Sequence, residues 1–351
     1  SPIRNFNGIT FLNQFRVSDS TAVGARGAEI FSPGHLAKDA SGIFFSAFDR
    51  FSVNKIYKFD PAASTVAVVA GQTFTDGFSI APGENGPATG ANILGFGSQI
   101  SVDSDGSVFF AESSGITGTS QHVVRKIGPT GTLTTVGGIF GIGGSVDPDG
   151  DPTLTTPANG RAGKLATKVL LDTPVAVLAT AADILVAEAG TFNVLRINKA
   201  AGTLSVANTV ALANEPDFLV ARADGSILVG SNSINTIDRI DAAGAVTTFG
   251  TATGFANRGL AVGGATGTTL YVLNGNSDID VFDINAVDGA IPLYTIVTPN
   301  FMLIGGITAS GTTITYASTG NQLRRFVDNG TATPAAFDTV AGSFFNVAGT
   351  G

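Results

Sequence analysis

Residues 99–112 read Q-I-S-V-D-S-D-G-S-V-F-F-A-E, and this stretch decides the fold class. A short alternating segment, I-S-V, precedes Asp105-Gly106, and an apolar run, V-F-F-A, follows it. An Asp-Gly pair supplies the positive φ angles and the side-chain acceptor that a tight antiparallel turn needs. The stretch therefore predicts a β-hairpin whose second strand begins at Val108.

Copies of this second strand recur along the chain at intervals that settle to about 43 residues. They read I-F-F-S from Ile43, V-F-F-A from Val108, I-L-V-A from Ile184, I-L-V-G from Ile227, L-Y-V from Leu270 and I-T-Y-A from Ile314. Each copy follows a turn and precedes two further strand-like segments. Four short strands in each of six units predict an all-β, six-bladed β-propeller of four-stranded antiparallel blades, because only stacking around a ring buries both apolar faces of a blade.

The repeats divide the chain into three parts. We expect an N-terminal extension at residues 1–28, the propeller at residues 29–342 and a C-terminal tail at residues 343–351. Within the extension, Gly8–Val17 alternates with a period of two and predicts a strand. This strand either completes the ring of its own molecule or adds to a blade edge of another copy.

Two connectors between blades, residues 72–93 and 139–170, are rich in Gly and Pro and are long for a compact domain. Such loops are either functional, ordered by a partner, or solvated excursions with local packing. The sequence leaves these alternatives open.

Composition limits the classes of partner. Charged residues make up 13% of the chain, the net charge is −8, and no basic cluster is longer than a pair such as Arg324-Arg325, which argues against nucleic-acid binding. No apolar run approaches the ~20 residues of a membrane span, so we expect no membrane insertion. Few lysines, many small residues and an acidic balance favour a secreted, extracellular or cell-surface protein.

Residues 69–138 resemble the NHL repeat of propeller proteins. The resemblance rests on V-A-G at 69–71, E-N-G-P-A-T-G-A-N-I-L at 84–94, the D-G turn with V-F-F-A-E, R-K-I at 125–127 and G-T-L-T-T-V-G-G at 131–138. It implies the propeller fold over about residues 30–342. It implies no single activity, because propellers of this kind serve as lyases, receptors, scaffolds and interaction modules.

The first strand of each propeller blade lines the central channel, so its opening residues form the expected ligand site. Here they include His35, Gln99, Asp217 and Arg258. A propeller that hydrolyses sugar lactones would place Glu, Asn and Asp there around a divalent cation, and Glu29 and Asp217 supply part of that set. The enzymatic hypothesis is a metal-dependent hydrolase or lyase acting through Glu29, His35, Asp217 and Arg258. The competing interpretation is a polar channel mouth without catalysis.

The segment Asp147-Pro148-Asp149-Gly150-Asp151 offers carboxylates at alternate positions of a Gly-bearing loop. Oxygen ligands in this arrangement suit calcium, and we expect Asp147, Asp149 and Asp151 to be its ligands if the loop binds an ion. The twelfth position of the loop is Ala158 and not Glu, so the EF-hand pattern is incomplete. The alternative is an acidic, solvated loop, and no other cofactor is predicted.

The fourth strand of each blade is an outer edge. Thr132–Val136 and Ala245–Phe249 carry no charge, so protection against edge pairing is expected to be thin. These edges and the incomplete catalytic sets favour a non-enzymatic, extracellular module that binds protein or glycan. Copies of the chain itself are the expected partner, in a surface fibre or layer.

Overall fold

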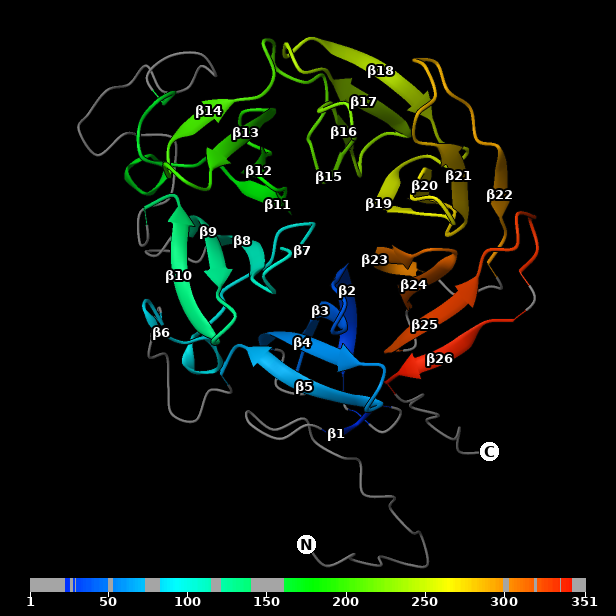
Figure 1. Ribbon diagram of the computed structural model, residues 1–351, viewed down its shortest axis with the longest axis horizontal. Helices are drawn as coiled ribbons and strands as arrows, with labels where there is room; N and C mark the ends of the chain where they lie inside the picture. The colour runs from blue at the N-terminus through cyan, green and yellow to red at the C-terminus, as the bar shows by residue number, and fades with distance from the viewer. Residues whose placement is uncertain are drawn as a thin grey trace, which may run out of the picture.

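Six antiparallel sheets stand around a ring in the computed structural model, which describes residues 23–25, 28, 30–49, 53–72, 83–114, 121–139, 161–298, 303–318, 321–334 and 336–342 (Figure 1). This confirms the predicted six-bladed, all-β propeller. The segments Gly8–Val17 and Ser343–Gly351 lie outside the described residues. The described part of the chain contains no helix long and apolar enough to cross a membrane.

In every blade the chain runs from the innermost strand to the outermost. Blade 1 contains β2 (Phe31–Lys38), β3 (Ile43–Phe48), β4 (Asn54–Asp60) and β5 (Thr65–Ala70), with β1 (Val23–Gly24) outside β5. Blade 2 contains β7 (Ser101–Val102), β8 (Val108–Ser114), β9 (Gln121–Ile127) and β10 (Thr132–Gly137), with β6 (Gly86–Pro87) outside β10. Blade 3 contains β11 (Pro174–Ala179), β12 (Asp183–Glu188), β13 (Asn193–Asn198) and β14 (Leu204–Val206).

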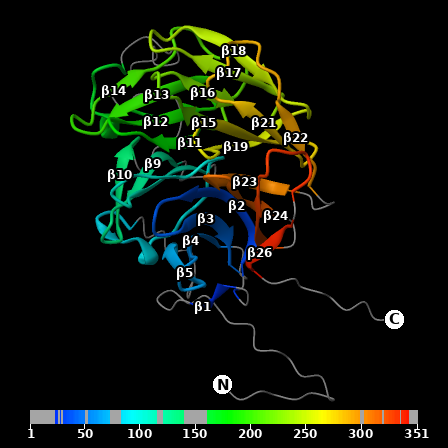
Figure 2. The ribbon, with the colours of Figure 1, turned by 45° about the vertical axis from the view of Figure 1, so that its right-hand side comes forward.

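The other three blades have four strands each and complete the ring, as the turned view of Figure 2 also shows. Blade 4 contains β15 (Phe218–Ala221), β16 (Ile227–Gly230), β17 (Thr236–Ile240) and β18 (Val246–Thr251). Blade 5 contains β19 (Asn257–Gly263), β20 (Thr269–Asn274), β21 (Ile279–Asp283) and β22 (Tyr294–Ile296). Blade 6 contains β23 (Leu303–Ser310), β24 (Thr313–Ser318), β25 (Gln322–Val327) and β26 (Asp338–Ala341).

Apolar clusters fill the interfaces between blades. One position of the second strand contributes a large side chain toward the following blade in five of them: Phe44, Phe109, Leu185, Leu228 and Tyr271. Because each of these side chains is packed between two sheets, its burial contributes about 1.5–3 kcal/mol to stability. The repeat recognised in the sequence is therefore the unit of core packing.

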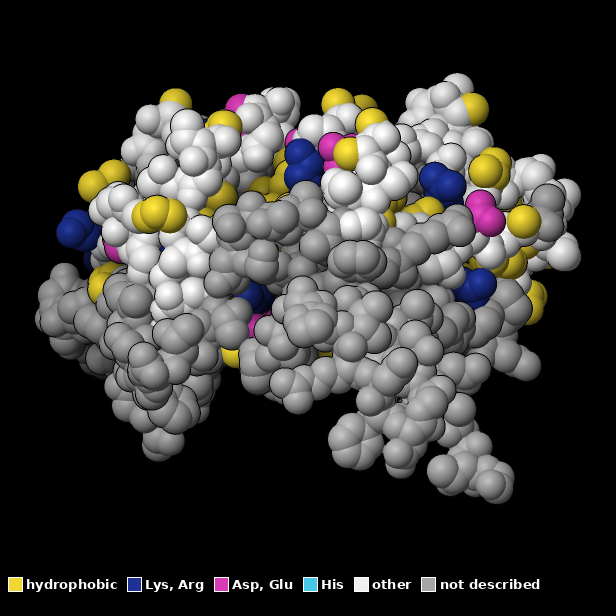
Figure 3. Space-filling model, turned by 90° about the horizontal axis from the view of Figure 1, so that it is seen from below, with side chains coloured by type: hydrophobic (Ala, Val, Ile, Leu, Met, Phe, Trp, Pro, Cys, Tyr) yellow, Lys and Arg dark blue, Asp and Glu magenta, His cyan; other side chains and the backbone are white. Residues whose placement is uncertain are grey.

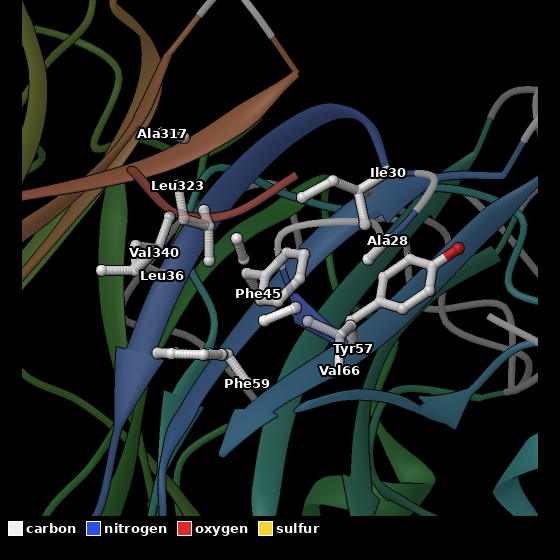
Figure 4. Packing of buried hydrophobic residues seen from close by; sticks show 13 residues of the cluster. Ala28, Ile30, Leu36, Phe45, Tyr57, Phe59, Val66, Ala317, Leu323 and Val340 are labelled. Carbon is white, nitrogen blue, oxygen red and sulfur yellow. The ribbon is translucent and has the colours of Figure 1, made fainter. Parts of the chain in front are cut away.

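Packing of blade 6 against blade 1 closes the ring. Leu36 and Phe45 of blade 1 share a buried cluster with Ala317, Leu323 and Val340 of blade 6 (Figure 4). The four strands of blade 6 are consecutive in the sequence, so the described residues show no strand exchanged between the chain ends within this blade. This interface is called the closing seam below.

Extra segments of the same chain cover the outer edges of blades 1 to 4. β1 pairs with β5, and β6 pairs with β10. Residues 163–166 bond to residues 202–204 at the edge of blade 3, and residues 289–290 bond to residues 248–251 of blade 4. The prediction that Thr132–Val136 and Ala245–Phe249 are unprotected edges is therefore wrong. Their missing charges reflect cover by the chain itself.

The outer edge of blade 5 differs. Within the described residues no strand pairs with the free side of β22. One backbone bond, from the Val297 N–H to the Ala332 carbonyl at 3.2 Å, joins the end of this edge to blade 6. At blade 6, the Gly342 N–H donates to the Ala25 carbonyl at 2.9 Å. β22 thus has no covering strand among the described residues, and the exposed residues Leu293 and Val297 lie directly before and after it.

Candidate functional site

The innermost strands bring the predicted channel residues to four blades. His35 lies in β2, Gln99 comes just before β7, Asp217 precedes β15, and Arg258 lies in β19. His35 and Arg258 thus lie within innermost strands, Gln99 and Asp217 lie just before such strands, and their role as a ligand site stays a prediction. The remaining predicted site residues lie outside the described part of the chain: Glu29, Asp147, Asp149 and Asp151.

Asp217 is the most heavily bonded of these residues. Its carboxylate accepts hydrogen bonds from the Ser98 hydroxyl at 3.0 Å, from the Asn232 backbone N–H at 2.8 Å and from the Asn232 amide at 3.1 Å. Burial raises the pKa of Asp217, while these hydrogen bonds and the charge of Arg258 oppose that rise. The carboxylate thus joins blade 2 to blade 4 across the centre of the ring.

Gln99 makes a second link between the same blades. Its side-chain oxygen accepts from the Leu219 N–H at 2.7 Å, and its amide donates to the Leu219 carbonyl at 2.9 Å. The inner strand of blade 2 also bonds to blade 3, where the Ala179 N–H donates to the Ser101 hydroxyl at 2.9 Å. Polar side chains that the sequence assigned to ligand binding therefore tie three inner strands together.

His35 sits in an unusual backbone conformation. Its φ is +34°, in the region that side chains other than Gly and Asn seldom adopt. Burial lowers the pKa of His35 to about 4. A hydrogen bond with the backbone of Ser98 raises the pKa, but by less than burial lowers it. The imidazole is therefore neutral at pH 7. Its Nδ1 is enclosed and has no hydrogen-bond partner among the described residues.

The described residues of the channel mouth form a polar surface, and they do not form a complete set of catalytic groups. Among the described residues, no group of three or more His, Asp or Glu side chains is placed to hold a metal ion. Arg258 is exposed and stays within electrostatic reach of Asp217. His35 and Asp217 both approach Ser98, one through its backbone and the other through its hydroxyl. This geometry can bind a small polar molecule, and the enzymatic hypothesis stays a prediction.

Two buried glutamates at the ends of second strands are structural residues that the sequence analysis did not single out. Glu188 ends β12 and forms a two-pronged ion pair with Arg161, at 2.7 and 2.9 Å. It also accepts from the Asp172 N–H at 2.9 Å and the Thr191 hydroxyl at 2.7 Å. Arg161 lies in the second long connector, so this cluster fixes the connector to blade 3.

Glu112 occupies the equivalent position of blade 2. It accepts from the Leu94 N–H at 3.2 Å and lies 3.7 Å from Nε of Arg125. Arg125 comes from the third strand and also bonds Glu84 of the first connector at 3.1 Å. Burial raises the pKa of Glu112 to about 7, with Arg125 opposing the rise. The recurring A-E at the end of V-F-F-A-E and I-L-V-A-E was the signal that could have revealed both glutamates.

The surface seen edge-on from the side of blade 1 carries scattered charges. In Figure 3 the Lys and Arg side chains of the described residues stand apart from one another, some of them beside Asp or Glu. The described residues of this face therefore form no continuous basic stripe of the kind that follows a nucleic-acid backbone.

Comparison with known proteins places the chain by its fold. No protein-family model matches it, and no curated protein matches it in sequence. A structural genomics protein of unknown function from Bacteroides thetaiotaomicron is similar, with a TM-score of 0.54 and 13% identity over 88% of this chain and 72% of that one.

Two other similar structures belong to named proteins. A chain of a nidogen/laminin complex has a TM-score of 0.51 and 11% identity over 88% of this chain and 91% of its own. Virginiamycin B lyase from Staphylococcus aureus has a TM-score of 0.50 and 15% identity over 91% of this chain and 87% of its own. At these identities the likeness shows the β-propeller fold alone.

Proposed function

We propose that this chain is a non-enzymatic, extracellular propeller of the NHL type that binds protein, with another copy of itself as the partner. Copies would assemble into a fibre or layer through the uncovered edge of blade 5. The observation that carries the proposal is the combination, on that edge, of a strand without a covering neighbour and exposed apolar side chains directly before and after it.

Leu293 and Val297 lie directly before and after β22 at this edge, which we call the blade 5 edge, whereas Val287 and Ile291 flank residues 289–290 at the boundary with blade 4. Val287 is 82% exposed, Ile291 77%, Leu293 66% and Val297 62%. Residues 289–298 contain no charged side chain. Exposed apolar patches on soluble proteins often mark interaction sites, and an unpaired strand adds backbone donors and acceptors to the patch.

The N-terminal extension is the segment that fits this edge. Gly8–Val17 places Ile9, Phe11, Phe15 and Val17 on one side of a predicted strand. Twenty-two residues precede Val23, which lies at the outer edge of blade 1, and an extended chain of that length reaches about 75 Å at most. That is enough to reach an adjacent copy.

Addition of this strand to β22 of the next copy would be β-augmentation. Backbone hydrogen bonds would supply the pairing, and the apolar side chains of the extension would cover those of the blade 5 edge. Such a contact joins two different surfaces, so it propagates into a ring or a fibre.

The polar network of the channel mouth supports the non-enzymatic part of the proposal. The side chains of Asp217 and Gln99 form hydrogen bonds with Ser98, Asn232 and Leu219. Breaking these bonds during a reaction would destabilise the protein, because it would leave buried polar groups unpaired.

Sedimentation velocity over a range of concentrations tests the proposal. The full chain is expected to form assemblies, and both removal of residues 1–17 and the Leu293→Lys substitution should shift the protein toward monomer. Val210→Lys, at a 58% exposed apolar residue far from β22 in the sequence, is the control and should assemble normally. A full chain that stays monomeric at high concentration, or assemblies that survive both changes, would refute assembly through this edge.

A further inference from the structure

The last blade breaks the packing rule of the other five. The second-strand position filled by a large side chain elsewhere holds Thr315 in blade 6. The pairing registers show the equivalence, because the residue opposite on the first strand is also small in several blades: Ala37 faces Phe44, Ala261 faces Tyr271, and Thr308 faces Thr315. Both members of this cross-strand pair in blade 6 are threonines.

The basic residue of the third strand is kept in blade 6. In blades 1 and 2 the ammonium groups of Lys58 and Lys126 lie over the rings of Phe44 and Phe109, at 5.3 and 5.6 Å from the ring centres. Arg325 occupies the same place and pairs with Thr315. Blade 6 therefore keeps the cation, as Arg325, but has Thr315 in place of the aromatic ring that lies beneath the cation in blades 1 and 2.

A cavity of about 270 Å³ occupies this place in the closing seam. Thr308, Thr315 and Arg325 of blade 6 form one wall. Lys38 and Phe59 of blade 1 belong to the opposite wall. The cavity is below the ~300–1,000 Å³ of sites for drug-sized ligands, so a small molecule is the suitable occupant.

Two buried hydroxyls line the cavity. Thr308 is 8% exposed and Thr315 is 4% exposed, and both residues line the cavity. Buried polar groups are nearly always hydrogen-bonded to protein, water or ligand. These hydroxyls are thus placed to bond a molecule inside the cavity.

The charge of the cavity favours an anion. Lys38 and Arg325 contribute two positive charges. Asp39 also lines the cavity, but one oxygen of its carboxylate accepts from the backbone N–H groups of Ser41 at 2.7 Å and Gly42 at 3.0 Å and so serves the turn. The contact of Arg325 with Asp338 is 3.9 Å long and well exposed, which makes it weak.

We propose that the closing seam binds a small hydroxylated carboxylate of the sugar-acid class. Lys38 and Arg325 would hold the carboxylate, the threonine hydroxyls would bond its hydroxyl groups, and the Phe59 ring would cover its apolar face. The proposal is independent of the assembly through blade 5, since it uses other residues and another interface.

Isothermal titration of the full chain with glucuronate, glucose and acetate tests the proposal. Glucuronate should bind measurably more tightly than both others, because only it has the charge and the hydroxyl groups together. Arg325→Gln should weaken glucuronate binding about tenfold or more, the effect of losing one charge-assisted hydrogen bond. Arg239→Gln removes the equivalent cation of blade 4 and is the control that should bind as the wild type does.

Thr315→Leu provides the second arm. It restores the residue found at this position in blades 3 and 4, so it should fill the cavity, abolish binding and leave the melting temperature unchanged or higher. Thr315→Val, which keeps the shape and removes the hydroxyl, should weaken binding in a chain that still folds. Equal affinity for glucuronate and glucose, or wild-type affinity in both Thr315 variants, would overturn the proposal.

Discussion

The outer strands of blades 3 and 5 both have backbone N–H and C=O groups that face away from their own sheet, and the chain covers them at blade 3 but not at blade 5 among the described residues. At blade 3, residues 163–166 run along β14 and bond to it. At blade 5, the exposed residues Leu293 and Val297 flank β22, which has no covering strand in the described residues. Because an uncovered edge invites pairing, this difference is the reason for placing the proposed partner site at blade 5.

The comparison also gives the long connectors a role. Their described parts cover the edges of blades 2 and 3, and an ion pair between an arginine and a glutamate fixes each of them, Arg125–Glu84 in the first and Arg161–Glu188 in the second. Blade 5 is followed by a short connector, and no strand pairs with the free side of β22 among the described residues. The two long connectors are therefore the ones whose described parts cover an edge.

The largest effect is expected from breaking the cover of blade 3. Glu188→Ala leaves Arg161 buried without its carboxylate, which should lower the free energy of unfolding by about 3–5 kcal/mol. Denaturant unfolding of both proteins measures the difference. Arg196→Met removes an exposed partner of Asp183 and should cost less than about 1 kcal/mol. Equal losses in the two variants would show that the Arg161 cluster does not hold the connector.

A smaller, pH-dependent effect is expected at blade 2. The pKa of Glu112 is raised from 4.5 to about 7, so the folded state binds more protons than the unfolded state between these values. The free energy of unfolding should therefore fall as the pH rises from about 4.5 to 7, by up to ~3 kcal/mol.

The Glu112→Gln variant isolates this contribution. Its unfolding free energy should depend less on pH than that of the wild type, and the two curves should separate most at pH 8. Parallel curves from pH 4 to 8 would mean that the pKa of Glu112 is the same in the folded and unfolded states, so that burial does not raise it.

At the blade 5 edge a single charge should weaken assembly. Leu293→Lys places an ammonium group directly before β22, at an exposed apolar position, so association should weaken by about tenfold, or ~1.4 kcal/mol, with no loss of folding stability. Light scattering during dilution measures the association constant, and circular dichroism checks the fold. Unchanged association would remove Leu293 from the interface.

The smallest effect is expected from salt. Each copy carries a net charge of −8, so copies repel one another at low ionic strength. Raising the salt concentration from about 0.01 to 0.15 M should screen this repulsion and raise the association constant several-fold. Residues 289–298 carry no charge, so salt should not weaken the contact at this edge. Assemblies that dissolve in salt would point to a charged interface instead.

The sequence predicted the architecture because the residues that reveal the repeat are also the residues that fill the core. Phe44, Phe109, Leu185, Leu228 and Tyr271 mark the second strands and also fill the blade interfaces. The positions of His35, Gln99, Asp217 and Arg258 at the innermost strands followed from the same periodicity.

What the sequence could not predict depends on contacts between distant residues. The bond from Ser98 to Asp217 spans 119 positions, and no local pattern announces it. The cover of Thr132–Val136 comes from β6, whose two residues are too few to show a period. The partner of Glu188 comes from a connector, whereas that of Glu112 comes from a strand, so the two buried ion pairs share no sequence motif.

Disulfide trapping tests the central claim most directly, because the chain contains no cysteine. Single variants with Cys in place of Phe11 and of Leu293 are mixed, oxidised and separated on a non-reducing gel. A strand of one copy added to β22 of another brings such residues within the 4.4–6.8 Å that a disulfide allows between Cα atoms, and moving the first cysteine to Ile9 or Phe15 samples the register. We predict a cross-linked dimer from these mixtures and none when Val210→Cys replaces the Leu293 variant. Equal cross-linking at Val210, or none at any register, would contradict assembly through the blade 5 edge.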